Sequence, residues 1–275
     1  MGTLKDLNNF TNELPTGENK MPLLFVGHDS PMNAIEDNEF SRGWNEIGKG
    51  LPKPKAILCI SSHWEANGTF VTQMEKPKTI HDFYGFPNKL FAVQYPANGS
   101  MELAKETKEL IKKTDIGFDN QWGLDHGCWS VLKHLYPDAD IPAIELSIDH
   151  YKSPLWHYEL AKEISSLRKK GVLILGSGNI VHNVKILNWD DPYSKYCWAE
   201  EINEKLKTLI TEGNYKDLIN YSSLGKSASL AIPTPEHYIP LLYILGLKEE
   251  KERIEFFNDK TVMGSISMTS MKVFS

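Results

Sequence analysis

The chain has 275 residues and a formal net charge of −6, and this length allows one large domain or two small ones, either with a sizeable core. Its basic residues are scattered, which argues against nucleic acid or an anionic membrane as the main partner. No apolar stretch approaches the about 18 residues that a membrane span needs. The three cysteines lack a C-x-x-C spacing, so we expect reduced thiols and a cytoplasmic protein.

Strand and helix signals alternate after a polar stretch at 1–20, which we expect to be a flexible N-terminal extension. In the first half the pattern predicts buried strands at 22–26 and 56–60, a weaker strand at 70–74, a long loop at 77–87, and helices over 40–51, at 100–113 and around Cys128.

The second half continues the alternation. The pattern predicts strands at 144–148 and 172–175, and helices from Ser153 to Gly171, over 198–209 and from Thr234 onward. The tail at 264–274 is expected to be an antiparallel edge strand. We find no internal repeat or linker. The sequence therefore predicts one α/β domain at 21–275, with a central, mostly parallel mixed sheet flanked by helices.

Four histidines follow an apolar run or lie near a helix start, among small, turn-forming residues: His28, His63, His182 and His237. The first three follow predicted strands, and open α/β folds bind ligands at the carboxyl ends of their strands. Because imidazole is the commonest metal ligand, this convergence predicts a metal site at the strand ends. Each of the first three taken alone is more typical of a hydrogen-bonded loop residue than of a ligand. His237, expected near the N3 position of a helix, is equally typical of a surface residue.

His126 lies between Asp125 and Gly127 at the start of a predicted helix. This position suits an acid–base residue, because imidazole titrates near neutral pH. His81 and Asp82 are candidates for a contact to a metal ligand or to the substrate, but a loop hydrogen bond is the more typical role of such a pair. The other histidines (His134, His150 and His157) are expected to be structural.

The segment Gly176–Val181 follows a strand and partly matches a dinucleotide-binding fingerprint. Valine stands in place of the third glycine, and no acidic residue occurs about 20 positions further on. We therefore reject nicotinamide or flavin binding and expect the glycines to give the backbone room beside His182.

Taken in order, the segments around these histidines resemble a known family. The similarity covers nearly all of the chain after Met21, and its segments are Phe25-Val26-Gly27-His28-Asp29-Ser30-Pro31, Ser61-Ser62-His63-Trp64, Gly123-Leu124-Asp125-His126-Gly127, Gly178-Asn179-Ile180-Val181-His182-Asn183 and Pro233-Thr234-Pro235-Glu236-His237-Tyr238. They resemble the class III extradiol ring-cleavage dioxygenases (LigB-like), and within that family the 4,5-DOPA extradiol dioxygenase branch.

The resemblance implies an enzyme that opens the ring of a catechol such as L-DOPA with molecular oxygen. It matches His28, His63, His182 and His237 to the metal-binding histidines, and His126 to the acid–base histidine. It implies one divalent ion per chain, Zn²⁺ or Fe²⁺. Iron oxygenases commonly use two histidines and one carboxylate, whereas four histidines suit zinc as well as iron. Glu236 would supply a carboxylate if the register differs by one residue.

Three residues depart from the family pattern, and we expect all three to lie close to the metal ligands: Asp29 and Tyr84, where the family usually has glycine, and Glu65, where it has a non-acidic residue. These departures leave two alternatives open. A zinc-dependent hydrolase would use the same ligands to activate water without oxygen. A non-catalytic binding protein would tolerate the loss of His126.

Overall fold

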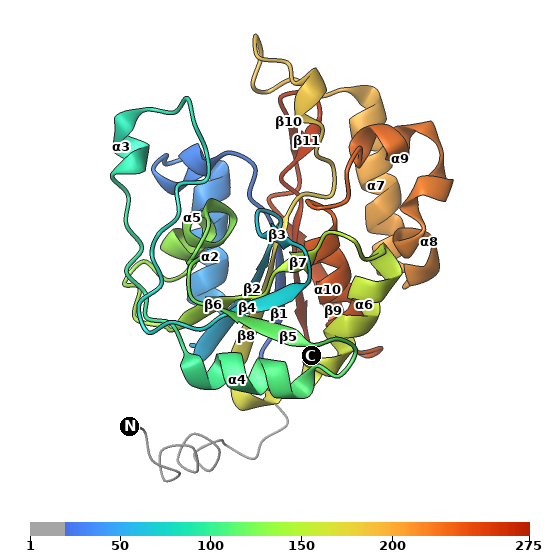
Figure 1. Ribbon diagram of the computed structural model, residues 1–275. Helices are drawn as coiled ribbons and strands as arrows, with labels where there is room; N and C mark the ends of the chain where they lie inside the picture. Colours follow the sequence, from blue (N-terminus) through green and yellow to red (C-terminus); the bar gives the residue numbers. More distant parts are fainter. Residues whose placement is uncertain (1–19) are drawn as a thin grey trace.

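A six-stranded mixed sheet forms the centre of the computed structural model, which describes residues 20–275 (Figure 1). The strand order is β6-β2-β8-β1-β12-β9. The strands are β1 (Leu23–Gly27), β2 (Ala56–Ser61), β6 (Ala143–Glu145), β8 (Val172–Gly178), β9 (Arg253–Phe257) and β12 (Ser270–Phe274). Strands β6, β2, β8 and β1 are parallel, and β12 runs antiparallel to both β1 and β9. The predicted mostly parallel mixed sheet is confirmed. The predicted extension at 1–20 lies outside the described residues, Lys20 excepted.

Two hydrophobic cores cover the two faces of this sheet. Alternate residues of each strand point to opposite faces, so Leu24 and Val26 join one core while Leu23 and Phe25 join the other. The first core includes α2 (Glu39–Gly50) and α5 (His126–Leu135), and the second includes α6 (Pro154–Glu163), α7 (Cys197–Thr211) and α10 (Ile239–Leu247). Figure 1 shows α2 and α5 on the left of the sheet and α6 and α10 on the right.

Shorter elements surround this framework. Three two-stranded sheets pair β3 with β7, β4 with β5 and β10 with β11. The elements are β3 (Glu65–Ala66), β4 (Thr69–Thr72), β5 (Ile116–Asp119), β7 (Ile148–Asp149), β10 (Thr261–Val262), β11 (Ile266–Ser267), α3 (Asn88–Phe91), α4 (Met101–Leu110), α8 (Tyr215–Ile219), α9 (Lys226–Ala231) and the 3₁₀ helices η1 (Pro31–Ala34), η2 (Ser165–Lys170), η3 (Val184–Ile186) and η4 (Tyr221–Leu224). Among residues 20–275, no helix has the length and apolar character needed to cross a bilayer.

The structure corrects two predicted strands. The strand predicted at 144–148 is divided into β6 and β7, because the N–H of Ser147 donates to Phe70 O in a neighbouring strand. The tail strand β12 is antiparallel as predicted, but it is not at the edge. The edge is β9, which the sequence analysis missed.

Two predicted helices also differ. The helix predicted from Ser153 to Gly171 is divided into α6 and η2, and Gly171 ends η2 with a left-handed φ of 82°. The helix predicted to open at Thr234 begins only at Ile239. Elements α8, α9 and η4 were missed because they are short and lack a sustained helical pattern.

Candidate metal centre

All five histidines singled out in the sequence lie together at the carboxyl ends of the parallel strands of the sheet. His28 follows β1, His63 follows β2 and His182 follows β8, three parallel strands whose carboxyl ends meet there. His126 begins α5, and His237 lies in the turn before α10. In two groups, one donor atom from each residue lies within 4.8 Å of the others: His28, His63 and His126, and His182, Glu236 and His237. The five histidines therefore cluster, but the four predicted ligands are divided between the two groups, and His126, predicted not to be a ligand, lies in the group of His28 and His63.

The closest approach in the cluster joins His28 Nε2 to His63 Nε2 at 3.0 Å. Two nitrogens bound about 2.1 Å from one ion, at about a right angle, are separated by about 3.0 Å. The observed separation is therefore that expected of two ligands of a single ion.

The other nitrogen of each imidazole is occupied. Ser177 donates its hydroxyl to Gly127 O at 2.6 Å, so its oxygen accepts from His28 Nδ1, 3.0 Å away. His63 Nδ1 faces Asp82 Oδ2 at 3.3 Å. If both imidazoles carry their hydrogen on Nδ1, the two Nε2 lone pairs face each other. Burial lowers the pKa of both imidazoles well below the usual value, so a proton does not relieve this repulsion at neutral pH. A metal ion would.

His182 and His237 form a second pair. Their rings are stacked, with centroids 3.5 Å apart and planes inclined by 10°. His237 Nδ1 lies 3.2 Å from Glu236 Oε1, which also accepts from Thr234 Oγ1 at 2.8 Å. This contact leaves Nε2 of His237 free to bind a metal. Two nearly parallel rings cannot both direct in-plane lone pairs at one ion. In this arrangement, only one of the two is oriented as a ligand of an ion shared with His28 and His63.

His126 is held by a carboxylate that also contacts a candidate ligand. Asp82 Oδ2 lies 3.0 Å from His126 Nδ1, and Asp82 Oδ1 accepts the backbone N–H of His126 at 3.0 Å. Burial opposes the ionised form of Asp82, but its contacts with His126 outweigh burial and lower its pKa. Phe83 packs edge-on against the His126 ring, with centroids 5.5 Å apart. A single loop therefore supplies both a charge and an apolar wall to His126.

Two sequence interpretations around this site were wrong in detail. His237 is not near N3 of a helix, because α10 starts two residues later. The glycines of β8 make room for the segment that carries His237, not for His182. A Cβ at Gly178 would lie 2.1 Å from His237 O, and one at Gly176 would lie 2.6 Å from Pro240 O.

The departures from the family pattern have different surroundings. Asp29 has a positive φ of 46°, and burial raises the pKa of its carboxyl to about 6. Glu65 pairs with His150 at 3.1 Å, and Tyr84 is 91% exposed. We had expected all three to lie close to the ligands. Only Asp29 is adjacent to one.

The remaining histidines have structural partners, as predicted. His81 Nε2 contacts Val93 O at 2.9 Å, and His157 contacts Tyr243 Oη and Asp149 O. The sequence analysis missed Ser177 as a partner of His28. It favoured only a loop hydrogen bond for Asp82, whose carboxylate contacts both His63 and His126. The signal for Asp82 was its place beside His81 in a loop without secondary structure.

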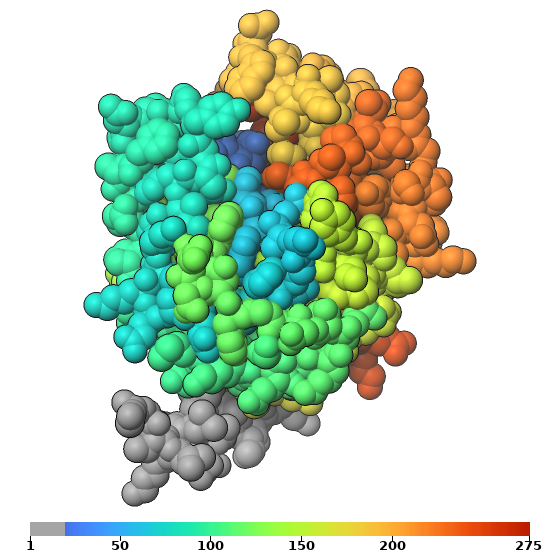
Figure 2. All heavy atoms as spheres, in the orientation of Figure 1, coloured from blue at the N-terminus to red at the C-terminus, as the bar shows by residue number. Residues whose placement is uncertain are grey.

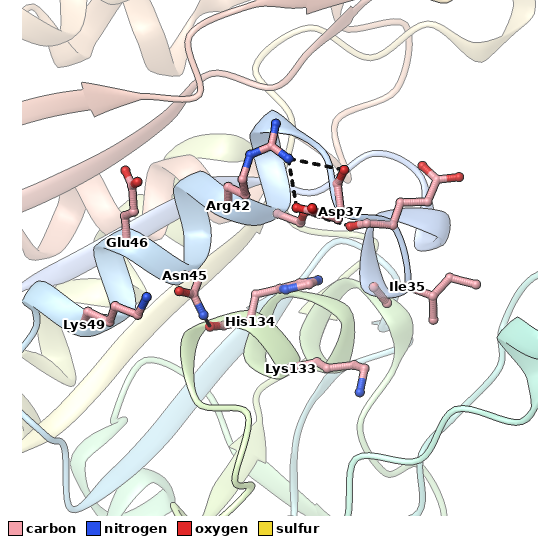
Figure 3. Close-up of a pocket in the computed structure, with 11 residues that line it drawn as sticks. Ile35, Asp37, Arg42, Asn45, Glu46, Lys49, Lys133 and His134 are labelled. Atoms are coloured by element: carbon pink, nitrogen blue, oxygen red, sulfur yellow. Dashed lines mark hydrogen bonds and ion pairs between the residues drawn. The ribbon is translucent and has the colours of Figure 1, made fainter.

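Two cavities adjoin the segment that follows His28. One, of about 720 Å³, is lined by Asp29, Met32, Tyr193 and Met263 among others. In Figure 2 the blue residues of the N-terminal part lie at the bottom of a hollow beneath the gold ones. The other cavity, of about 660 Å³, lies between α2 and α5 (Figure 3). His134 lines it, but its Nε2 contacts Asn33 O at 2.8 Å, and none of the five clustered histidines reaches it.

Comparison with known proteins gives the class of enzyme to which this site belongs. Residues 21–274 match the family model of the catalytic LigB subunit of aromatic ring-opening dioxygenase. The chain therefore belongs to the LigB family and is an extradiol ring-cleavage dioxygenase.

Individual relatives extend over most of the chain. It is 45% identical over 258 residues to a protein of Escherichia coli K12 named 4,5-DOPA dioxygenase extradiol, covering 92% of this chain and 95% of that protein. It is 35% identical to the protein of the same name from Beta vulgaris, covering 94% of this chain and 98% of that protein. A crystal structure of the uncharacterized protein JW3007 from Escherichia coli K12 is similar, with a TM-score of 0.81 and 41% identity, covering 92% of this chain and all of that one.

Proposed function

We propose that the protein is a metal-dependent dioxygenase that cleaves the ring of a catechol such as L-DOPA, as the names of its relatives suggest. The main observation in support is the pair of Nε2 atoms 3.0 Å apart, each on an imidazole whose Nδ1 is already occupied. A cation between the two nitrogens would satisfy both lone pairs.

We assign His28, His63 and one of the stacked pair His182 and His237 as the ligands of one Zn²⁺ or Fe²⁺ ion. A donor set of histidines is compatible with zinc, but zinc has no redox chemistry of its own. Bound ferrous iron with open coordination positions supplies binding of both catechol oxygens and electron transfer to oxygen. We therefore propose that iron supports ring cleavage and that a zinc-loaded form does not.

We assign His126 the transfer of a proton. Its Nδ1 faces Asp82, so its Nε2 is the atom available to a catechol hydroxyl. When the hydroxyl O–H bond breaks, the proton moves to this nitrogen, and the Asp82 carboxylate stabilises the resulting imidazolium. The same nitrogen returns the proton as the product forms.

The overall reaction balances with oxygen as its only oxidant. One ring C–C bond next to the paired hydroxyls breaks, and both atoms of O₂ enter the product. The product is a ring-opened semialdehyde bearing a carboxylate. No external reductant is needed.

The free cysteines, of which Cys59 and Cys128 are buried, are consistent with the reducing cytoplasm, the compartment that we infer.

The test is anaerobic loading of the protein with ferrous iron or with zinc, followed by addition of L-DOPA and oxygen. We expect the iron form to consume oxygen and produce a yellow product, and the zinc form to be inactive. Ester or amide hydrolysis by the zinc form would instead favour a hydrolase. An absence of oxygen uptake over a panel of catechols, with verified iron content, would favour a binding protein.

A further inference from the structure

Two fully buried carboxyl groups lie beside the segment that carries His126. They belong to Asp125 and to Glu145, at the end of β6, and both residues are 0% exposed. The backbone N–H of Asp125 donates to Glu145 Oε1 at 2.8 Å, and Trp122 Nε1 lies 3.3 Å from Glu145 Oε2. The mechanism proposed above uses neither carboxyl.

The partners of this pair are neutral donors. Ser61 donates its hydroxyl to Asp125 Oδ1 at 2.6 Å, and the N–H of Cys128 donates to the same oxygen at 3.1 Å. Among the ion pairs of the described residues, none joins Asp125 or Glu145 to a lysine or arginine. Two adjacent carboxylates with only neutral donors cannot both stay ionised in a buried site. The pair therefore retains one proton.

The contacts indicate which residue holds that proton. Burial raises the pKa of both carboxyls, and the charge of each neighbour raises the other further. Asp125 accepts from Ser61 and from the Cys128 N–H at the start of α5, and this position favours its ionised form. We therefore assign the proton to Glu145, and Asp125 Oδ2, which has no donor among the described residues, is the acceptor available to it.

The ionised Asp125 contacts two of the segments that build the site. It is the N-cap of α5, the helix whose first residue is His126. A carboxylate stabilises this position because it accepts from unpaired N–H groups at the helix start. Through Ser61 it also reaches β2, since the N–H of His63 lies 3.3 Å from Ser61 Oγ. Glu145 therefore connects β6 to the start of α5 and to the end of β2.

We propose that Glu145 is a positioning residue for the dioxygenase site: its neutral carboxyl holds Asp125 in place and so fixes the turn that presents His126. This inference rests on the proposed function. It assigns to Glu145 a larger effect on turnover than on metal binding, because Asp125 caps the helix of His126 directly and reaches His63 only through Ser61.

The test compares Glu145→Gln with Glu145→Ala in iron-loaded protein, measuring bound iron, kcat and KM. Glu145→Ala should lower kcat by about 10–100-fold with near-normal iron, since misplacement of a catalytic group by about 1 Å costs that much. Glu145→Gln should remain within a few-fold of the unmodified protein, because its amide can donate to Asp125 Oδ2 and accept from the Asp125 N–H. Glu252→Ala is the matched control, since Glu252 is a buried carboxylate that binds Arg168 elsewhere. It should lower stability without lowering kcat per iron.

A second measurement decides the question even if Glu145→Ala does not fold. The infrared C=O stretch of a protonated carboxyl should be present in the unmodified protein at neutral pH and absent from Glu145→Gln. If this band is missing, or if Glu145→Ala keeps full kcat, the proposal is overturned. Equal loss of kcat in the Gln and Ala variants would also reject it. An unmodified protein that shows the band but turns over no catechol would reject the proposed function instead.

Discussion

Replacement of Ser177 by alanine tests the geometry that supports the metal centre. The Ser177 hydroxyl donates to Gly127 O and accepts from His28 Nδ1, and both contacts are buried. It thereby keeps hydrogen on Nδ1 and leaves Nε2 of His28 free. Alanine at this position removes both contacts and introduces no new steric conflict.

The two lost contacts have separable energies. Gly127 lies inside α5 and its carbonyl keeps an intrahelical donor, so loss of the Ser177 hydrogen bond should lower the free energy of unfolding of the metal-free protein by about 0.5–1.5 kcal/mol. Loss of the group that orients a metal ligand typically weakens metal affinity by about 10–100-fold. A factor of ten corresponds to about 1.4 kcal/mol, so the metal-loaded protein should lose a further ~1.4–2.8 kcal/mol.

The assay is urea unfolding with and without saturating metal, together with a chelator competition that gives the metal Kd. Ser130→Ala is the control, because the Ser130 hydroxyl is equally buried but has no hydrogen-bond partner among residues 20–275. It should leave metal affinity unchanged. Unaltered affinity in Ser177→Ala would refute the assignment of His28 as a ligand oriented by this hydroxyl.

Three further predictions concern turnover, substrate charge and pH. His126→Gln should keep its metal but lose roughly 10²–10⁴-fold in kcat, the usual effect of removing a positioned proton-transfer group; loss of metal would instead make His126 a ligand. Asp29→Asn should lower kcat/KM several-fold for dopamine relative to 3,4-dihydroxyphenylacetate, because a partly exposed ion pair between the Asp29 carboxylate and the ammonium group of dopamine would contribute about 1 kcal/mol. Equal effects on the two substrates would show that Asp29 does not contact the charged arm. Burial opposes the charge of Glu252, but the hydrogen bond from Arg168 outweighs burial and lowers the pKa of the carboxyl below its ordinary value of 4.5. The pair should therefore stabilise the fold fully above pH 4.5 and lose this contribution as the pH falls through the lower pKa of the folded state. Glu252→Gln should flatten the acid limb of a stability–pH curve, and an unchanged limb would contradict this.

The sequence predicted the buried framework well because its signals are local. The strands at β1, β2 and β8 are continuous apolar runs, and a run of this kind is typical of a parallel strand covered on both faces. The same signal located His28, His63 and His182, since each follows such a run within a few residues. Errors arose where tertiary contacts decide: β9 has an exposed Arg253 and is defined by its pairing with β12.

The orientation of the site histidines could not be predicted from the sequence, because the partners that orient them are distant in the chain. Ser177 is separated from His28 by 149 positions, and Glu145 from Asp125 by 20. Serine on a strand and glutamate at a strand end are common, so neither carries a local signal. The family resemblance matched the histidines themselves but gave no information about which nitrogen of each is free.

The histidines depend on two kinds of partner, and the difference has a chemical reason. His28 uses a neutral hydroxyl, which fixes its tautomer without adding charge. His126 faces the carboxylate of Asp82 through Nδ1, which leaves its Nε2 for the substrate. A metal ligand must keep an unprotonated nitrogen, whereas an acid–base group must accept and release a proton. His63 also faces Asp82, at 3.3 Å, but its Nε2 lies 3.0 Å from that of His28, so we assign this nitrogen to the metal and not to proton transfer. The same carboxylate can therefore hold His126 in place for proton transfer while only orienting His63, and Asp82→Asn should reduce turnover more than it reduces metal affinity.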